Sequence, residues 1–265
     1  MDKKNEFDYG YIPSPKDIRD YRICGVGTKL ELPESFKISH SKIKNQKNVG
    51  SCVAHGISEI LETNDGINYS TGWIYGYRPK EYHQGSGMIP SEALKTVNKV
   101  GYIPNEKLDI NVEMDEAKRI VDSNLEEYKK EASHKQIKSY ARLYGEKEIK
   151  EALYNLKVPV AICFGVGESG LKLDKEFVAY IPERYSGGHL TVCYGWNEKG
   201  FLIQNSWGES WGNKGTFILP YEYPIRESWL ISFYTSEEEN LRIRKPYLYL
   251  IRKIIMKIIN FFRKK

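Results

Sequence analysis

Cysteine is scarce in this sequence, and long apolar runs are missing from it. Only four cysteines occur among 265 residues, and none lies at the C-x₂-C spacing that metal sites commonly use. No apolar run follows the first six residues, so we expect no secretory signal peptide. These absences favour a reducing compartment and a cytoplasmic location, while release by lysis or by an unconventional route stays open. Nothing in the composition suggests a metal or an organic cofactor.

Acidic residues are missing from positions 241–265, where nine of the 40 Lys and Arg residues lie. The remainder of the chain has 31 basic and 35 acidic residues, so its charge is about −4 although the whole chain carries +5. A nucleic-acid-binding protein needs a basic face on its folded body. The charge distribution therefore argues against a nucleic-acid partner.

This basic tail has the pattern of an amphipathic helix. Its apolar runs fall well short of the ~18 residues that span a bilayer. One helical face would be apolar and the other basic, which predicts peripheral attachment to an anionic membrane surface. Contact with a partner protein, or docking on this chain, is the alternative. The apolar face comprises Tyr247, Leu248, Ile251, Ile254, Ile255, Ile258, Ile259 and Phe262.

Helical periodicity marks the first half of the chain, and short β-rich runs mark the second. Val53, Ile57 and Leu61 fall on one helical stripe, which ends just before Gly66. Runs rich in β-branched and aromatic residues follow Pro159. This order predicts an α+β protein with two lobes. The other expected helices are 90–101, 115–132 and 146–156, and the expected strands are 160–166, 190–196, 201–204 and 216–219.

Cys52 stands at the start of the first predicted helix, directly after Gly50 and Ser51. The unpaired N–H groups and the positive dipole end of a helix favour a thiolate, which is the nucleophilic form of cysteine. An inert, buried cysteine in the first helical turn is the alternative, and position alone favours it.

Three further residues, by their spacing, favour a nucleophilic Cys52 over an inert one. Gln46 lies six residues before Cys52, His189 follows a Gly-Gly pair, and Asn205 stands sixteen residues after His189 in the run Asn-Ser-Trp-Gly. In this set the sequence resembles the papain-like cysteine peptidases (family C1), whose His and Asn follow the cysteine by roughly 130–150 residues. Here the separations are 137 and 153 residues. The resemblance covers residues 32–235, and the short leader before it is similar to that of bacterial members.

The resemblance implies a papain-like fold and hydrolysis of peptide bonds through a thioester acyl-enzyme. Cys52 would be the thiolate nucleophile, ion-paired with His189 as general acid and base. Asn205 would orient the imidazole under the ring of Trp207. Gln46 would donate an N–H to the tetrahedral oxyanion.

The resemblance also implies where substrate binds. A glycine-rich strip would pair with extended substrate, and many relatives carry Gly-Gly where this chain has Gly87-Met88. Val49 and Gly85 replace two cysteines that commonly form a disulfide in relatives. Loss of that disulfide lowers the stability by ~2–4 kcal/mol, and its absence suits a reducing compartment. The implied substrate-binding residues are Gly87, Met88, Pro90, Gly188 and Leu190.

The expected organisation is a leader, a peptidase domain with its cleft between two lobes, and the tail. The leader is expected to cross the cleft as an inhibitory strap, and a belt packed on the outside is an equally weighted alternative. Two other functions stay open: a different thiol acyl-transfer enzyme (amidase or transpeptidase), and a catalytically silent binding protein. The expected ranges are 1–31 for the leader, roughly 40–133 for the helical lobe, roughly 134–235 for the β-rich, barrel-like lobe, and 236–265 for the tail.

Overall fold

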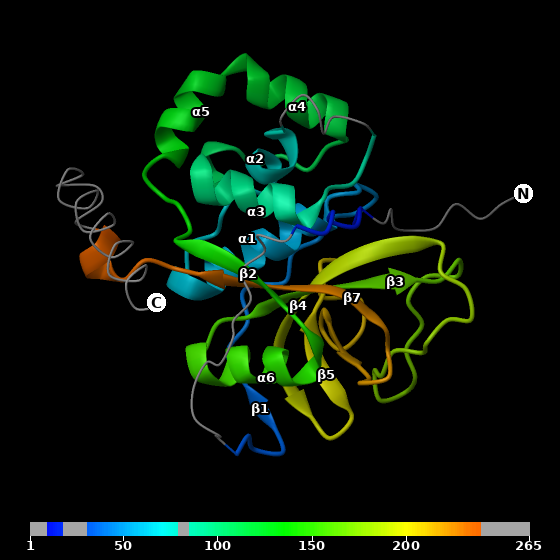
Figure 1. The fold of residues 1–265 in the computed structure, drawn as a ribbon. Helices are drawn as coiled ribbons and strands as arrows, with labels where there is room; N and C mark the ends of the chain where they lie inside the picture. The colour runs from blue at the N-terminus through cyan, green and yellow to red at the C-terminus, as the bar shows by residue number, and fades with distance from the viewer. Residues whose placement is uncertain (1–9, 18–30, 79–84, 240–265) are drawn as a thin grey trace, which may run out of the picture.

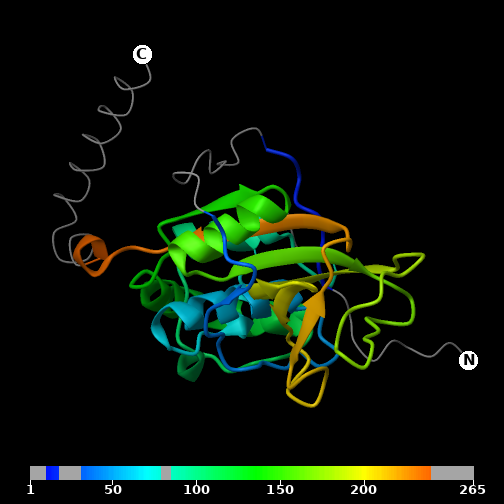
Figure 2. The same ribbon diagram turned by 90° about the horizontal axis from the view of Figure 1, so that it is seen from below.

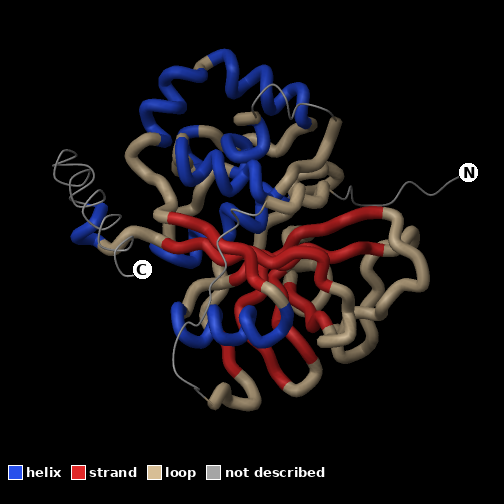
Figure 3. Tube along the Cα trace, viewed as in Figure 1, coloured by secondary structure: helices blue, strands red, loops and turns tan. Residues whose placement is uncertain are grey.

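The computed structural model describes residues 10–17, 31–78 and 85–239. Most of the predicted leader and the predicted amphipathic helix of the tail lie outside these ranges. Within them, one group of helices lies on one side of a large antiparallel sheet, and a single helix covers part of the sheet's other side (Figures 1 and 3). The predicted mixture of helices and antiparallel strands is confirmed. No helix in these ranges is long and apolar enough to cross a membrane.

The helices begin and end where the sequence carries start and stop signals. Helix α1 starts at Cys52, and Gly66 ends it with a φ of 77° and an N–H that donates to the Glu62 carbonyl. Helix α3 starts with Pro90 in its first turn. The bounds are Cys52–Asp65 (α1), Thr71–Gly76 (α2), Pro90–Lys99 (α3), Met114–Ser123 (α4), Leu125–Ala132 (α5) and Gly145–Leu156 (α6), with a 3₁₀ turn at Asn105–Lys107.

Two helical features differ from the sequence prediction. The expected helix 115–132 is two helices, because the chain leaves helical geometry at Asn124, where φ is −136°. The Asn124 side chain donates to Glu127 Oε2 (3.1 Å) in the following turn. Helix α2 was not predicted, since its glycines weaken helix propensity. A Cβ on Gly76 would lie 2.7 Å from the Ala117 carbonyl oxygen, so packing against α4 requires that glycine.

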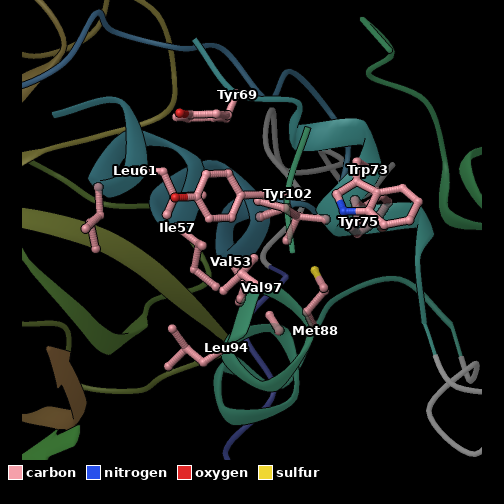
Figure 4. Close-up of a cluster of buried hydrophobic side chains, with 14 of the residues drawn as sticks. Val53, Ile57, Leu61, Tyr69, Trp73, Tyr75, Met88, Leu94, Val97 and Tyr102 are labelled. Carbon is pink, nitrogen blue, oxygen red and sulfur yellow. The ribbon is translucent and has the colours of Figure 1, made fainter. Parts of the chain in front are cut away.

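An apolar core surrounds the inner face of α1 (Figure 4). Val53, Ile57 and Leu61 are at most 1% exposed, and burial of each such side chain contributes ~1.5–3 kcal/mol. Trp73 of α2 adds a hydrogen bond from Nε1 to the Gly101 carbonyl oxygen (2.9 Å). This core fixes the position of α1, and with it Cys52. The other side chains labelled in Figure 4 are Tyr69, Tyr75, Met88, Leu94, Val97 and Tyr102.

The strands of the described ranges form one seven-stranded sheet in the order β2-β7-β3-β4-β5-β6, with β1 paired to β4. All pairs are antiparallel, and α6 packs on the sheet (Figure 2). The four predicted strands are confirmed as β3 to β6, whereas β1, β2 and β7 were missed. The bounds are Phe36–Lys37 (β1), Ser139–Leu143 (β2), Val160–Val166 (β3), Gly187–Asn197 (β4), Gly200–Gln204 (β5), Thr216–Leu219 (β6) and Ile225–Ser232 (β7).

Candidate active site

Cys52 is the first residue of α1 and is completely buried. The residue before it, Ser51, has a non-helical φ of −105° and makes no side-chain cap. The backbone N–H groups of Leu190 and Gly10 hydrogen-bond the Cys52 sulfur, as do N–H groups of the first helical turn. These donors and the helix N-terminus favour the thiolate form. The Leu190 contact also places the sulfur beside the start of β4.

His189 and Asn205 meet because β4 and β5 are paired strands. Val192 of β4 lies opposite Gln204, the last residue of β5, so the sixteen-residue separation is one hairpin. His189 Nε2 lies 2.8 Å from Asn205 Oδ1. An amide oxygen only accepts hydrogen bonds, so Nε2 carries the proton of the neutral ring and Nδ1 is the basic nitrogen. Asn205 Oδ1 also accepts the Ser206 N–H (2.9 Å), which fixes the amide.

An indole ring covers the bond between the histidine and the asparagine. The Trp207 ring stacks on His189 with centroids 4.7 Å apart and an interplanar angle of 23°. Trp207 is itself only 3% exposed and meets Trp211 edge to face at 4.8 Å. The imidazole is therefore held by a hydrogen bond in its plane and by stacking on its face.

Gln46 is buried and held at both ends of its amide. Its Oε1 accepts the Ser206 hydroxyl (2.7 Å), and its Nε2 donates to the Val49 carbonyl (2.9 Å). The backbone N–H of Gln46 donates to the Ser206 carbonyl (2.8 Å). The segment before α1 is thereby tied to the segment that carries Asn205 and Trp207.

The two parts of the molecule approach closely beside Cys52. Helix α1 packs on β4. A Cβ on Gly56 would lie 2.3 Å from Leu190 Cδ2, so the glycine allows this approach. The packing brings the start of α1 next to Leu190, the neighbour of His189.

Burial changes the protonation of both reactive groups in this structure. It raises the pKa of the Cys52 thiol to about 11, because a charged sulfur would lose its hydration. It lowers the pKa of His189 to about 4 for the same reason, although the hydrogen bond to Asn205 opposes that shift. At neutral pH the buried pair is therefore a thiol and a neutral imidazole. The ion pair that the resemblance implies stays a prediction for a site that is open to water.

The cover is an N-terminal segment, residues 10–14, that we call the strap. It lies at the junction of the helices and the sheet (dark blue in Figure 1). Tyr11 N–H donates to the Gly188 carbonyl (3.0 Å), and Ile12 N–H donates to the Met88 carbonyl (2.9 Å). Met88 N–H donates to the Gly10 carbonyl (2.6 Å), so the strap runs parallel to the glycine-rich strip at Gly87-Met88. The strap therefore pairs with the residues that the sequence assigns to substrate.

The remaining predicted substrate residues lie around the same site. Gly87 has a φ of 95°, and a Cβ there would lie 2.9 Å from the Gly10 carbonyl oxygen. Pro90 opens α3, and the next residue, Ser91, donates its N–H to Ser14 Oγ of the strap (3.2 Å). Gly188 and Leu190 flank His189. The structure thus brings Gly87, Met88 and Gly188 to the strap and Leu190 to Cys52, while Pro90 directly precedes the strap contact at Ser91.

Two residues of the site were missed by sequence reasoning. Glu227 of β7 is 5% exposed, and its Oε1 accepts the Tyr11 hydroxyl (2.8 Å) and the Ser14 N–H (2.6 Å). Arg142 of β2 forms an ion pair with Glu227 Oε2 (3.0 Å). Neither strand was predicted, and a lone acid between Arg226 and Ser228 carries no signal of burial.

Comparison with known proteins agrees with this geometry. An uncharacterised peptidase C1-like protein of Acanthamoeba polyphaga mimivirus is 29% identical over 73% of this chain and 69% of its own length. Mouse cathepsin K is 28% identical over 67% of this chain and 55% of its own length. The crystal structure of xylellain, a cysteine protease from Xylella fastidiosa, superposes with a TM-score of 0.73 at 22% identity, over 89% of this chain and 99% of xylellain. The sequence model of the papain family of cysteine proteases matches residues 32–224. The chain therefore belongs to that family of cysteine peptidases.

Proposed function

We propose that Cys52 and His189 hydrolyse peptide bonds through a thioester acyl-enzyme. The observation that carries the proposal is the hydrogen bond between His189 Nε2 and Asn205 Oδ1 at 2.8 Å, beneath the stacked Trp207 ring. It leaves Nδ1 of the imidazole to exchange a proton with the sulfur, as a cysteine peptidase requires.

The proposed steps assign one role to each of these groups. The Cys52 thiolate attacks the carbonyl carbon of the substrate, and His189 then gives its proton to the departing amine. Water, deprotonated by the same imidazole, hydrolyses the thioester and releases the carboxylic acid product. The Cys52 N–H and Gln46 Nε2 stabilise the oxyanion, and such a donor typically contributes ~3–4 kcal/mol of the lowered barrier. The contacts of Gln46 to Ser206 and Val49 orient that amide before substrate arrives.

The same proposal assigns an inhibitory role to the strap. Gly10 presents its N–H to the sulfur, and its carbonyl oxygen bonds Met88 N–H and not the oxyanion donors. The strap also removes water from both reactive groups, which keeps them neutral. Substrate therefore binds only after the strap leaves the strip and Gly188.

Substitution of the nucleophile tests the chemistry. We expect Cys52→Ala to abolish labelling by a thiol-directed peptidyl electrophile and to lower peptide hydrolysis by a factor on the order of 10⁴ or more. Labelling and cleavage of a peptide library are measured on the full chain and on a full-length Gly10→Ala variant. Cys193→Ala is the matched control, since that thiol is buried in β4 with a contact to the Gly195 carbonyl.

Two outcomes would count against the proposal. Hydrolysis retained by Cys52→Ala would remove the nucleophile from its role. Labelling at Cys52 without cleavage of any peptide would favour a silent binding protein. Product analysis with an added amine nucleophile separates hydrolysis from acyl transfer, because a transferase would give mainly the aminolysis product.

Membrane attachment of the tail stays a prediction of the sequence, as does the cytoplasmic location. We expect the full chain to co-sediment with vesicles of anionic lipid and a chain ending at residue 240 to stay in the supernatant, because the nine basic residues lie in 241–265. Vesicles of neutral lipid serve as the control for charge. Equal pelleting of both chains on anionic vesicles would exclude the tail as an anchor.

A further inference from the structure

The side chain of Tyr11 fills a pocket beside the reactive cysteine. Tyr11 is 5% exposed and belongs to the same buried cluster as Met88, Leu190 and Cys163. A Cβ on Gly188 would lie 2.4 Å from Tyr11 Cδ1, so the ring lies flush against that glycine. Burial raises the pKa of the Tyr11 hydroxyl, which keeps it a hydrogen-bond donor at neutral pH. The pocket is therefore apolar around the tyrosine ring, and its inner end accepts a hydrogen bond from the tyrosine hydroxyl.

The acceptor at the inner end is a carboxylate held on its far side. Glu227 Oε2 accepts Trp229 Nε1–H (2.9 Å) and pairs with Arg142 Nη2 (3.0 Å). The Arg142 guanidinium in turn stacks over the Trp229 ring at 4.9 Å. These contacts orient Glu227, balance its charge with one cation, and leave Oε1 directed at the Tyr11 hydroxyl.

Departure of the strap removes two donors from that oxygen. Glu227 Oε1 then loses the Tyr11 hydroxyl and the Ser14 N–H together. A buried acceptor without its donor costs ~1–3 kcal/mol, and more when it is charged. The next occupant must therefore supply a donor at the depth of a tyrosine hydroxyl. A phenylalanine cannot, and a lysine or arginine would bring a second cation to a carboxylate that Arg142 already neutralises.

We propose that this pocket selects a tyrosine side chain in the substrate, with Glu227 as the residue that determines the specificity. The inference rests on the proposed peptidase function and names its substrate class. The strap would then inhibit by offering the side chain that the pocket prefers. The tyrosine would lie close to the scissile bond, since the Tyr11 backbone bonds Gly188, the neighbour of His189.

A positional scan of peptides tests the selection. Matched fluorogenic peptides carry Tyr, Phe, Leu or Arg at each of the four positions before the scissile bond. We expect one position at which kcat/KM for Tyr exceeds that for Phe at least tenfold, with Arg below Tyr, because a site built around a hydroxyl rejects the analogue that lacks it. The ratio is taken between peptides in the same enzyme sample, so strap occupancy cancels from it.

A double substitution distinguishes an effect on the specificity of the pocket from an effect on folding. Glu227→Leu combined with Arg142→Met removes both buried charges at once, which avoids leaving one of them unpaired. We expect kcat/KM to fall for the Tyr peptide and to rise for the Phe peptide, so that the Tyr-to-Phe ratio drops to about one or below. If the double variant fails to fold, the scan on the unsubstituted enzyme still decides the matter.

The outcomes distinguish the inference from the proposed function. Equal cleavage of Tyr and Phe peptides at every position, with labelling at Cys52, would overturn the pocket assignment and leave the peptidase intact. Preference for Arg would overturn it as well. Absence of cleavage of every peptide by the Gly10→Ala variant would overturn the peptidase function itself.

Discussion

Replacing Gly10 by alanine should raise peptidase activity by roughly tenfold to a hundredfold. A Cβ at this position would lie 1.8 Å from the Gly50 carbonyl oxygen, and the nearest atoms are all backbone. No side-chain rotation can relieve that contact, so the strap must leave its place or shift by more than an ångström. Overpacking of this kind typically costs ~1–3 kcal/mol. The fraction of molecules with an open site rises by the corresponding factor.

The measurement is kcat/KM on a peptide substrate, with active sites titrated by a thiol-directed electrophile. Gly66→Ala is the matched control, because it also strains the backbone, here through a φ of 77°, but its Cβ would meet no atom within 4 Å and it lies at the end of α1, away from the strap's contacts. We expect the control to have the activity of the unsubstituted chain. Equal activity of Gly10→Ala and the control, with both folded, would show that the strap does not limit access and would favour a structural belt.

The residues of the candidate site could be picked out from the sequence because each lies in a locally defined position. Cys52 is the first residue of a helix, and one hairpin sets the sixteen-residue spacing between His189 and Asn205. Strands of alternating or continuous apolar character, such as β3, were found for the same reason: their pattern is local.

The specificity pocket could not be predicted, because long-range pairing creates it. Strand β7 lies between β2 and β3, and that position buries Glu227 beside Arg142, 85 residues earlier in the chain. In the sequence both residues are ordinary charges. Tyr11 was visible only as part of a leader with two possible paths, and its hydroxyl contact with Glu227 depends on which path the leader takes.

The rate of Cys52 alkylation should level off at a lower pH in the uncovered enzyme than in the covered one. With the strap in place, burial raises the pKa of Cys52 to about 11, so the thiolate fraction at pH 7 is ~10⁻⁴. The rate with iodoacetamide should then rise tenfold per pH unit up to about pH 11. In open molecules of Gly10→Ala, water returns to the site. The loss of hydration that raised the pKa of Cys52 and lowered the pKa of His189 is then relieved. The helix N-terminus and an imidazolium at His189 then stabilise the thiolate, so the inflection moves well below pH 9.

The expected difference at pH 7 is alkylation of Cys52 that is roughly tenfold to a hundredfold faster in Gly10→Ala, the factor by which the fraction of open molecules rises. Mass spectrometry of the labelled peptides identifies the site, and Cys52→Ala in the same background gives the blank. Cys193 is the internal control, because burial also raises the pKa of its thiol and its sulfur contacts the Gly195 carbonyl oxygen within β4. Superimposable profiles for the two enzymes would mean that the strap does not set the protonation of the nucleophile. A shifted profile without increased peptide hydrolysis would mean that the strap controls the protonation of Cys52 but that its departure is not sufficient for substrate to bind. The remaining obstacle to substrate would then lie in the pocket that Tyr11 occupies.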